Sequence, residues 1–226
     1  MVRIVVRLAA DTALVAFLLF LSAGTLTWWR GWLLLAVMLM IRAVGALVVY
    51  RINPVLMQER AKLPFHADQT WRDRVLLFGV LATGFLGLPI VAGLDAFRWH
   101  LLPSPPEAVS AMGLVMFASG WCLKSLALCA NAFAIPVVRV QTERAHAVAD
   151  AGVYSVVRHP FYAADPLIFA GLGLWLESYV AVFGAAIPVA LMIMRLRLEE
   201  EFLIRELPAY NEYMARVPHR LIPRVW

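Results

Sequence analysis

The sequence predicts an all-α, polytopic integral membrane protein: a helical bundle of five to six transmembrane helices followed by a C-terminal cytoplasmic region. Composition is the first reason. The 226 residues are 62% hydrophobic and 15% charged, with a mean hydropathy of +0.77, whereas soluble domains are about half apolar and about a quarter charged. The other reasons are recurring apolar runs of membrane-spanning length and an alternation of basic residues between the loops.

Apolar runs of suitable length recur along the chain. A membrane-spanning helix needs about 20 predominantly apolar residues, and four such runs occur at 12–28, 32–50, 75–94 and 108–133. A fifth run at 163–194 is too long for one crossing and is interrupted by Glu177 and Ser178, which predicts a helical hairpin of two short passes. Although Arg3 and Arg7 precede the first run like a secretory signal, a second run follows at once, so we expect an uncleaved first helix.

The distribution of Lys and Arg predicts the topology. Two precede the first run, and the successive loops then hold one, five, one, three and none, with six more from residue 195 onward. Since cytoplasmic loops are enriched in Lys and Arg, this alternation favours six passes with both termini in the cytoplasm; five passes plus a re-entrant segment is the alternative. The net charge of +5 is explained by this orientation signal rather than by nucleic acid, because no basic stripe with interleaved aromatics lies outside the apolar runs.

Four residues inside the runs need separate interpretation. Cys122 and Cys129 are seven residues apart, so they share a helical face and are not expected to bridge each other. Arg42 and Lys124 place charge within spans, which is a functional indication by default. For Arg42, which lies nine residues before Arg51, snorkelling to the cytoplasmic interface is the favoured interpretation.

Polar residues suited to chemistry gather in the last 90 residues. The motif Arg158-His159-Pro160 predicts a fixed turn before a helix, because proline restricts the residue that precedes it. A helix start there offers free backbone N–H groups to an anionic group. Arg195 and Glu199 are four residues apart and share a helix face.

Each of these features also has an ordinary structural interpretation. Arg195 and Glu199 fit a plain ion pair where the helix leaves the bilayer, and His159 fits a hydrogen-bonded structural histidine. Four tyrosines fit membrane-interface aromatics: Tyr154, Tyr162, Tyr210 and Tyr213. The sequence has no G-x-G-x-x-G, P-loop, H-E-x-x-H or C-x-x-C motif, and its histidines lack metal-ligand spacing, so a metal or haem enzyme is not supported.

An ordered set of motifs resembles the isoprenylcysteine carboxyl methyltransferase and phospholipid methyltransferase superfamily, especially its short bacterial members. The set consists of V-x-V-Q-T-E-R-x-H at 138–146, G-V-Y-S-V-V-R-H-P-F-Y at 152–162, R-x-x-x-E-E-x-x-L at 195–203, A-Y-N-E-Y at 209–213 and R-L-I-P at 220–223. The resemblance departs from the usual pattern at Ala163-Ala164, at Asp165-Pro166 and at Ala209.

The resemblance implies a methyltransferase that binds S-adenosylmethionine without a Rossmann fold. It places Arg195 where the family holds the substrate carboxylate or head group, with Arg158, Glu200, Tyr210 and Arg220 as further candidates. The implied cofactor-binding residues are Gln141, His146, Ala147, Val148, Ala149, Tyr154, His159, Pro160, Phe161, Tyr162 and Glu199.

The resemblance also sets the expected organisation and acceptor. One domain would cover residues 1–226, with transmembrane helices in 1–135 and the cofactor-binding loop, hairpin and C-terminal segment in 136–226. The expected acceptor is lipid-like, foremost the carboxylate of an isoprenylcysteine-type compound, and the expected location is the bacterial inner membrane. Three alternatives stay open: N-methylation of a phospholipid amine, another isoprenoid-modifying or lipid-modifying membrane enzyme, and a non-enzymatic membrane partner protein.

Overall fold

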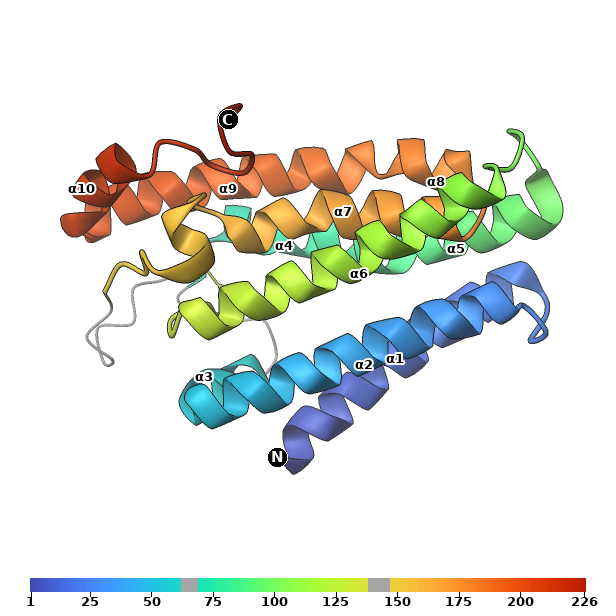
Figure 1. Ribbon diagram of the computed structural model, residues 1–226, viewed down its shortest axis with the longest axis horizontal. Helices are drawn as coiled ribbons and strands as arrows, with labels where there is room; N and C mark the ends of the chain where they lie inside the picture. The colour runs from blue at the N-terminus through green and yellow to red at the C-terminus, as the bar shows by residue number, and fades with distance from the viewer. Residues whose placement is uncertain (62–68, 138–146) are drawn as a thin grey trace.

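The protein is a bundle of helices, as the sequence predicts (Figure 1). The computed structural model describes residues 1–61, 69–137 and 147–226, and the regular elements within these ranges are all helical. They are α1 (Val2–Ala23), α2 (Trp29–Ile52), α3 (Pro54–Arg60), α4 (Trp71–Val80), η1 (Leu81–Gly87), α5 (Leu88–Leu94), η2 (Asp95–Trp99), α6 (Glu107–Ala130), η4 (Gly152–Ser155), α7 (Pro160–Trp175), α8 (Tyr179–Gly184), α9 (Ala186–Glu206) and α10 (Ala209–Arg216).

Five helical stretches of the described chain are long and apolar enough to cross a membrane. They are Val2–Ala23, Trp29–Ile52, Trp71–Trp99, Glu107–Ala130 and Tyr179–Glu206. In the third stretch, the π-helical segments η1 and η2 continue the α-helical parts without a break. The sixth element, α7, has 16 residues, or about 24 Å at about 1.5 Å per residue, which is shorter than a full crossing.

The hairpin predicted at Glu177 and Ser178 is confirmed. Helix α7 ends at Trp175, Glu177 adopts a left-handed backbone with φ of 61°, and Ser178 caps α8 by accepting a hydrogen bond from the Ala181 N–H at 3.0 Å. A further hydrogen bond of 2.7 Å from Ser178 Oγ to Asp95 Oδ2 ties this turn to η2.

The prediction that both passes of the hairpin are short is wrong. The returning pass, α8 and α9, extends over 28 residues to Glu206. It continues beyond the apolar run because Arg, Leu and Glu, which fill the sequence after Met194, are strong helix formers.

The connections of the bundle are gathered at its two ends. Helix α3, helix α10 and the segment around η4 lie at one end, together with the N-terminal part of α1 (Figure 1). The turns after α1, η2 and α7 lie at the opposite end. We call the first end the α10 end; the described parts of the two connections rich in Lys and Arg lie there.

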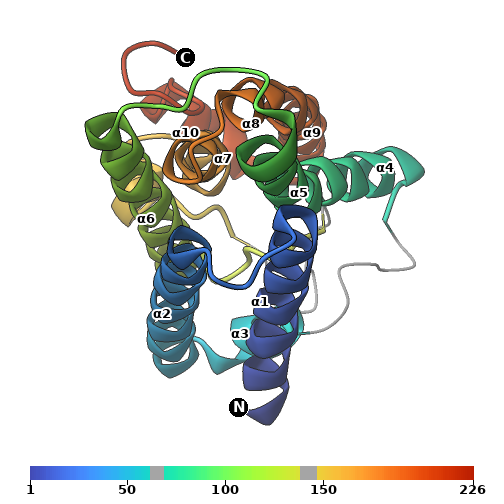
Figure 2. The ribbon, with the colours of Figure 1, turned by 90° about the vertical axis from the view of Figure 1, so that its right-hand side faces the viewer.

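Helices α6 and α7 pack closely along one another and position the inner face of α7. Gly171 of α7 lies against α6, where an added Cβ would stand 2.5 Å from the Phe117 N atom. Gly120 of α6 lies against α7 in the same way, 2.9 Å from the Ala164 carbonyl oxygen. Small residues at such contacts let membrane helices approach backbone to backbone. Helix α7 also contacts α2, α5, α8 and α9 (Figure 2).

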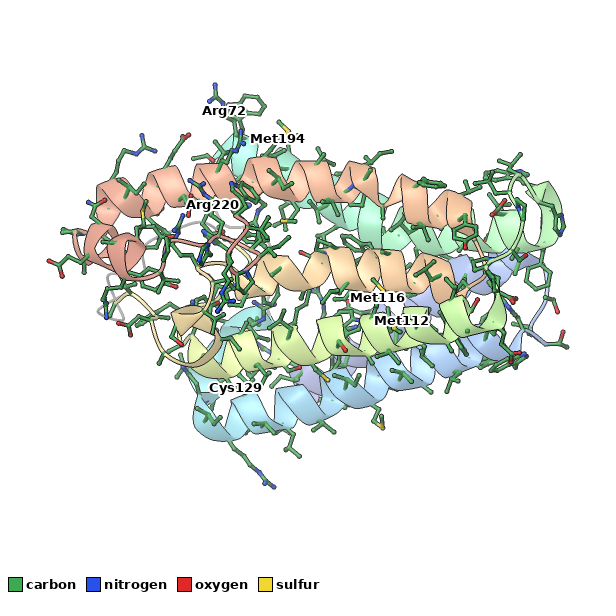
Figure 3. All side chains as sticks on the ribbon, turned by 45° about the horizontal axis from the view of Figure 1, so that its top comes forward. Arg72, Met112, Met116, Cys129, Met194 and Arg220 are labelled. Carbon is green, nitrogen blue, oxygen red and sulfur yellow. The ribbon has the colours of Figure 1, made fainter. Side chains whose placement is uncertain are left out.

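The outer faces of the helices are apolar, as a lipid environment requires. Met112 and Met194, labelled in Figure 3, are more than half exposed, and many Val, Leu, Ile, Phe and Trp side chains are exposed alongside them. Cys122 and Cys129 are free thiols, as expected.

Candidate functional site

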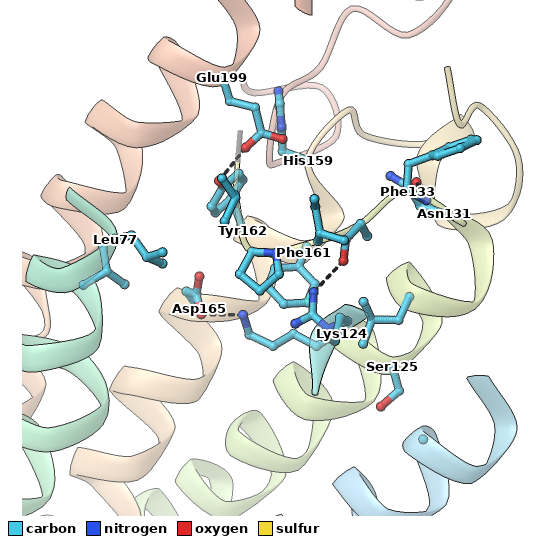
Figure 4. A pocket seen from close by; sticks show the side chains of 18 of the residues that line it. Leu77, Lys124, Ser125, Asn131, Phe133, His159, Phe161, Tyr162, Asp165 and Glu199 are labelled. Carbon is cyan, nitrogen blue, oxygen red and sulfur yellow. Dashed lines mark hydrogen bonds and ion pairs between the residues drawn. The ribbon is translucent and has the colours of Figure 1, made fainter. Parts of the chain in front are cut away.

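A cavity of about 550 Å³ lies among the helices, and Tyr210 and Tyr213 of α10 belong to its lining. Side chains from α1, α2, α4, α6, α7, α9 and α10 line it, together with the chain around 131–137 and 147–149. Figure 4 shows its polar wall, where side chains of α7 and α9 face those of α6. The cavity therefore borders both the polar end of the molecule and the apolar interior of the bundle.

Arg195 organises the polar wall from the middle of α9. Its Nε donates to Asp73 Oδ1 at 2.8 Å, its Nη1 to the Tyr162 hydroxyl at 2.7 Å and its Nη2 to the Pro136 carbonyl at 2.6 Å. These bonds use three of the five N–H donors of a guanidinium. The Tyr162 hydroxyl donates in turn to Glu199 Oε2 at 2.5 Å. Arg195 and Glu199 are thus linked through Tyr162 rather than by the plain i,i+4 ion pair considered from the sequence.

Glu200 is the centre of a second buried cluster next to the first. Its carboxylate accepts from Arg158 Nε at 2.8 Å and from Arg220 Nε at 2.6 Å, and it lies 3.2 Å from His159 Nε2. The Tyr210 hydroxyl lies 3.5 Å from the same His159 nitrogen. The cluster brings together the further candidates implied by the family resemblance, which are Arg158, Glu200, Tyr210 and Arg220.

The predicted turn before α7 is present, but His159 is not extended, since its ψ is 61°. His159 precedes the helix with φ of −127°, and Pro160 occupies its first turn. The N–H groups of Arg158 and His159 donate to the carbonyls of His219 and Arg220, each at 2.9 Å. The C-terminal segment therefore fixes the turn that carries His159 at the cavity.

The four tyrosines are not interface aromatics, as one interpretation of the sequence had them, because all four are buried. Tyr154 is the buried residue of η4, and its carbonyl accepts a 2.7 Å hydrogen bond from the Tyr213 hydroxyl. Burial raises the pKa of Tyr154 to about 12, and burial likewise raises the pKa of Tyr210 and of Tyr213 above the ordinary value. These hydroxyls therefore stay neutral at physiological pH.

Two cations lie close to the aromatic ring of Phe161. Lys124 Nζ is 3.7 Å from the ring centroid and the Arg60 guanidinium carbon is 5.1 Å from it. Arg60 also donates to the Ala134 carbonyl at 2.5 Å, and burial lowers its pKa to about 10. All of these residues line the cavity.

Two ion pairs inside the bundle were not predicted. Lys124 Nζ lies 2.8 Å from Asp165 Oδ1, with both side chains buried. Arg42 Nη2 lies 2.7 Å from Asp11 Oδ2, and the Arg42 guanidinium carbon lies 5.1 Å from the Trp121 ring centroid. The snorkelling favoured for Arg42 is therefore wrong, because a carboxylate of α1 holds its side chain within the bundle. Asp11 directly precedes the first apolar run and Asp165 lies near the start of the fifth, and an acidic residue at such a position is the signal that could have identified each partner.

The structure brings most of the sequence-predicted site residues to one cavity. Those that line it are Ala147, Val148, Ala149, Tyr154, Arg158, His159, Phe161, Tyr162, Arg195 and Glu199. Pro160 is buried at the start of α7 without lining the cavity. Gln141 and His146 lie outside the described residues.

Comparison with known proteins finds a family model that matches the part of the chain containing α7, α9 and almost all of α6. Residues 108–209 match the family model described as phospholipid methyltransferase, so the superfamily resemblance seen in the motifs is confirmed. The chain is 38% identical over 68 residues to the cobalt-zinc-cadmium resistance protein CzcN of Cupriavidus metallidurans. That match covers 30% of this chain and 32% of the relative, so the two proteins correspond over about a third of their lengths.

Proposed function

We propose that the protein is a membrane-embedded S-adenosylmethionine-dependent methyltransferase with a lipid-like acceptor, because residues 108–209 match the phospholipid methyltransferase family model. The observation that supports this most is the linked set Arg195, Tyr162 and Glu199 on the wall of a cavity that borders both the polar end and the apolar interior. A polar cofactor and an apolar acceptor need such a boundary to meet.

The chemistry of the cavity wall fits the proposed cofactor. When bound, S-adenosylmethionine supplies an electrophilic methyl carbon on a positively charged sulfur. Glu199 presents a carboxylate that can accept hydrogen bonds from its ribose or amino groups. The rings of Phe161, Tyr154 and Tyr210 supply surfaces that suit adenine and a sulfonium. The segment 147–149 and His159 complete this side of the proposed binding site.

The remaining donors of Arg195 suit an anionic acceptor group. Asp73 and the Pro136 carbonyl hold the guanidinium in place, so little side-chain entropy is lost when it orients a carboxylate. A carboxylate is ionised at neutral pH and needs no general base. We therefore assign carboxyl O-methylation of an isoprenylcysteine-type compound as the foremost reaction, with Arg195 orienting the acceptor and Arg158 supporting the site through Glu200.

A second acceptor class has support from the family description. The matched family is named for phospholipid methylation, which makes a phospholipid amine the alternative acceptor. An ammonium must lose a proton before it can accept a methyl group, so this reaction would need a base that carboxyl methylation does not require.

The proposed orientation follows from the basic residues. Both chain ends and the described parts of the basic connections lie toward the α10 end, which we place in the cytoplasm by the positive-inside rule. The cofactor would then enter from the cytoplasm and the acceptor from the lipid, within one domain of residues 1–226 in a bacterial inner membrane.

Transfer of a labelled methyl group tests the proposal. Purified protein in mixed micelles should methylate N-acetyl-S-farnesylcysteine from labelled S-adenosylmethionine, with base-labile label showing an ester. Label found instead in phosphatidylethanolamine would favour the amine acceptor. If folded protein binds neither S-adenosylmethionine nor its demethylated product, the methyltransferase assignment is wrong.

A further inference from the structure

The buried pair Lys124 and Asp165 lies deeper in the cavity than the Arg195 network. Asp165 follows Tyr162 by three residues on α7, so the two share a face about one helical turn apart. Figure 4 shows Asp165 facing Lys124 next to Phe161, with Tyr162 and Glu199 farther along the same wall. Both members of the pair line the cavity, and neither belongs to the motifs that carry the family resemblance.

Packing alone already holds the two helices of this pair together. Gly120 and Gly171 bring α6 and α7 into backbone contact on either side of Phe117 and Ile168, and this interface is the most extensive between two helices of the described chain. Charged residues are costly at membrane depth and are usually kept there for function. An ion pair is therefore not needed to join α6 to α7, and its position on a cavity wall needs another explanation.

The pair presents two complementary groups to the cavity. Lys124 Nζ lies 2.8 Å from Asp165 Oδ1, and no second described residue forms a hydrogen bond with this oxygen. An ammonium has three N–H donors and a carboxylate accepts at two oxygens, so one ion pair leaves capacity on both sides. Both side chains are more than nine-tenths buried, at 6% and 3% exposure, so bulk water satisfies little of this capacity.

We propose that Lys124 and Asp165 form a subsite for the acceptor head group, one that recognises an adjacent hydrogen-bond donor and acceptor. Asp165 accepts from an N–H group of the head group, and Lys124 donates to a neighbouring oxygen. The inference rests on the proposed function, since it assigns the polar part of the acceptor to this subsite while Arg195 holds the reacting group one turn away.

Two kinds of lipid carry this chemistry. In an N-acylated prenylcysteine, the amide supplies the N–H and the carbonyl oxygen, and it is attached to the same carbon as the carboxylate. In phosphatidylethanolamine, the ammonium and the phosphate play the two parts. A lipid with an anionic group alone, such as a prenylthio-carboxylic acid or phosphatidic acid, offers an acceptor but no donor.

Binding of two matched pairs of probes tests the subsite. The first pair is N-acetyl-S-farnesylcysteine and S-farnesylthiopropionic acid, and the second is phosphatidylethanolamine and phosphatidic acid in nanodiscs. Because a hydrogen bond to a charged group contributes about tenfold or more to affinity, the full-length protein should bind the donor-bearing member of at least one pair about ten times more tightly.

Variants that remove or reverse the pair identify its role. Lys124→Met with Asp165→Leu removes both charges together, which avoids leaving one buried charge unpaired. Lys124→Asp with Asp165→Lys keeps an ion pair but exchanges the donor and acceptor sides. Each double variant should lose the preference for the donor-bearing probe while retaining binding of S-adenosylhomocysteine.

A matched control is the pair Arg30 and Glu177, which joins α2 to the hairpin turn at 3.3 Å and lies outside the cavity lining. Arg30→Met with Glu177→Asn should keep the probe preference. The proposal is overturned if the wild-type protein prefers neither donor-bearing probe, or if a folded double variant keeps the preference. Failure to bind S-adenosylhomocysteine in the wild type would instead refute the methyltransferase assignment, so the two failures are distinguishable.

Discussion

The Tyr162 hydroxyl is the link between Arg195 and Glu199, and Tyr162→Phe removes it while keeping the ring. The hydroxyl accepts from Arg195 Nη1 at 2.7 Å and donates to Glu199 Oε2 at 2.5 Å, and a hydrogen bond to a charged group contributes about 1.5–3 kcal/mol. Arg195 keeps its hydrogen bonds to Asp73 and to the Pro136 carbonyl. The main effect of the variant is therefore that Glu199 loses its hydrogen bond from Tyr162. We expect methyl transfer to slow about 10- to 100-fold, since about 1.4 kcal/mol corresponds to a factor of ten.

The assay compares kcat/KM for methyl transfer with the unfolding temperature of the same preparation in detergent. Tyr179→Phe is the matched control, because Tyr179 begins α8 at the opposite end of the bundle, outside the cavity lining. The control should retain its rate. Unchanged kinetics in Tyr162→Phe, or an equal loss in Tyr179→Phe, would refute the role assigned to the hydroxyl.

Three further outcomes are expected. In thermal denaturation, Gly171→Ala should destabilise the protein by about 1–3 kcal/mol, because the new Cβ would meet the α6 backbone. The control Gly184→Ala should have little effect, because its Cβ would stand 3.4 Å from Leu88. Burial raises the pKa of Tyr154 from 10.0 to about 12. The stability that this shift contributes is complete below pH 10 and is lost as the pH rises toward 12. Tyr154→Phe should therefore lose less stability than wild type between pH 9 and pH 11, and an equal loss would contradict the assignment. Arg195→Lys, which loses the planar fork but keeps the charge, should raise the acceptor KM at least tenfold with little change in cofactor affinity by calorimetry; equal loss of both would oppose its proposed role.

Hydropathy and charge predict most of the fold because apolar runs indicate which segments cross the bilayer and basic residues indicate which loops lie on its cytoplasmic side. The interruption at Glu177 and Ser178 predicts the hairpin because two polar residues in an apolar run mark its exit to water, and the structure has its turn there. The end of α9 is not predicted by hydropathy, since helix propensity continues the helix after the apolar residues stop. In the same way α1 begins at Val2 rather than near Thr12, because its basic residues are compatible with a helix that leaves the membrane.

The motifs predict which residues gather at the cavity but not how they contact one another. The spacing of Arg195 and Glu199 puts them on one face, yet only the position of α7 places the Tyr162 hydroxyl between them. Asp73 lies 122 residues before Arg195 in the chain, so no local pattern connects the two. The partners of Arg42 and Lys124 depend likewise on helix packing.

The central claim is that this cavity binds S-adenosylmethionine through Glu199, and isothermal titration calorimetry of the purified protein measures that binding directly. Wild-type protein should bind S-adenosylmethionine or S-adenosylhomocysteine with micromolar affinity. Glu199→Gln keeps the side-chain shape but removes its charge, so it should bind at least tenfold more weakly while retaining a cooperative unfolding transition. Absence of binding by folded wild-type protein, or equal affinity in Glu199→Gln, would contradict the claim.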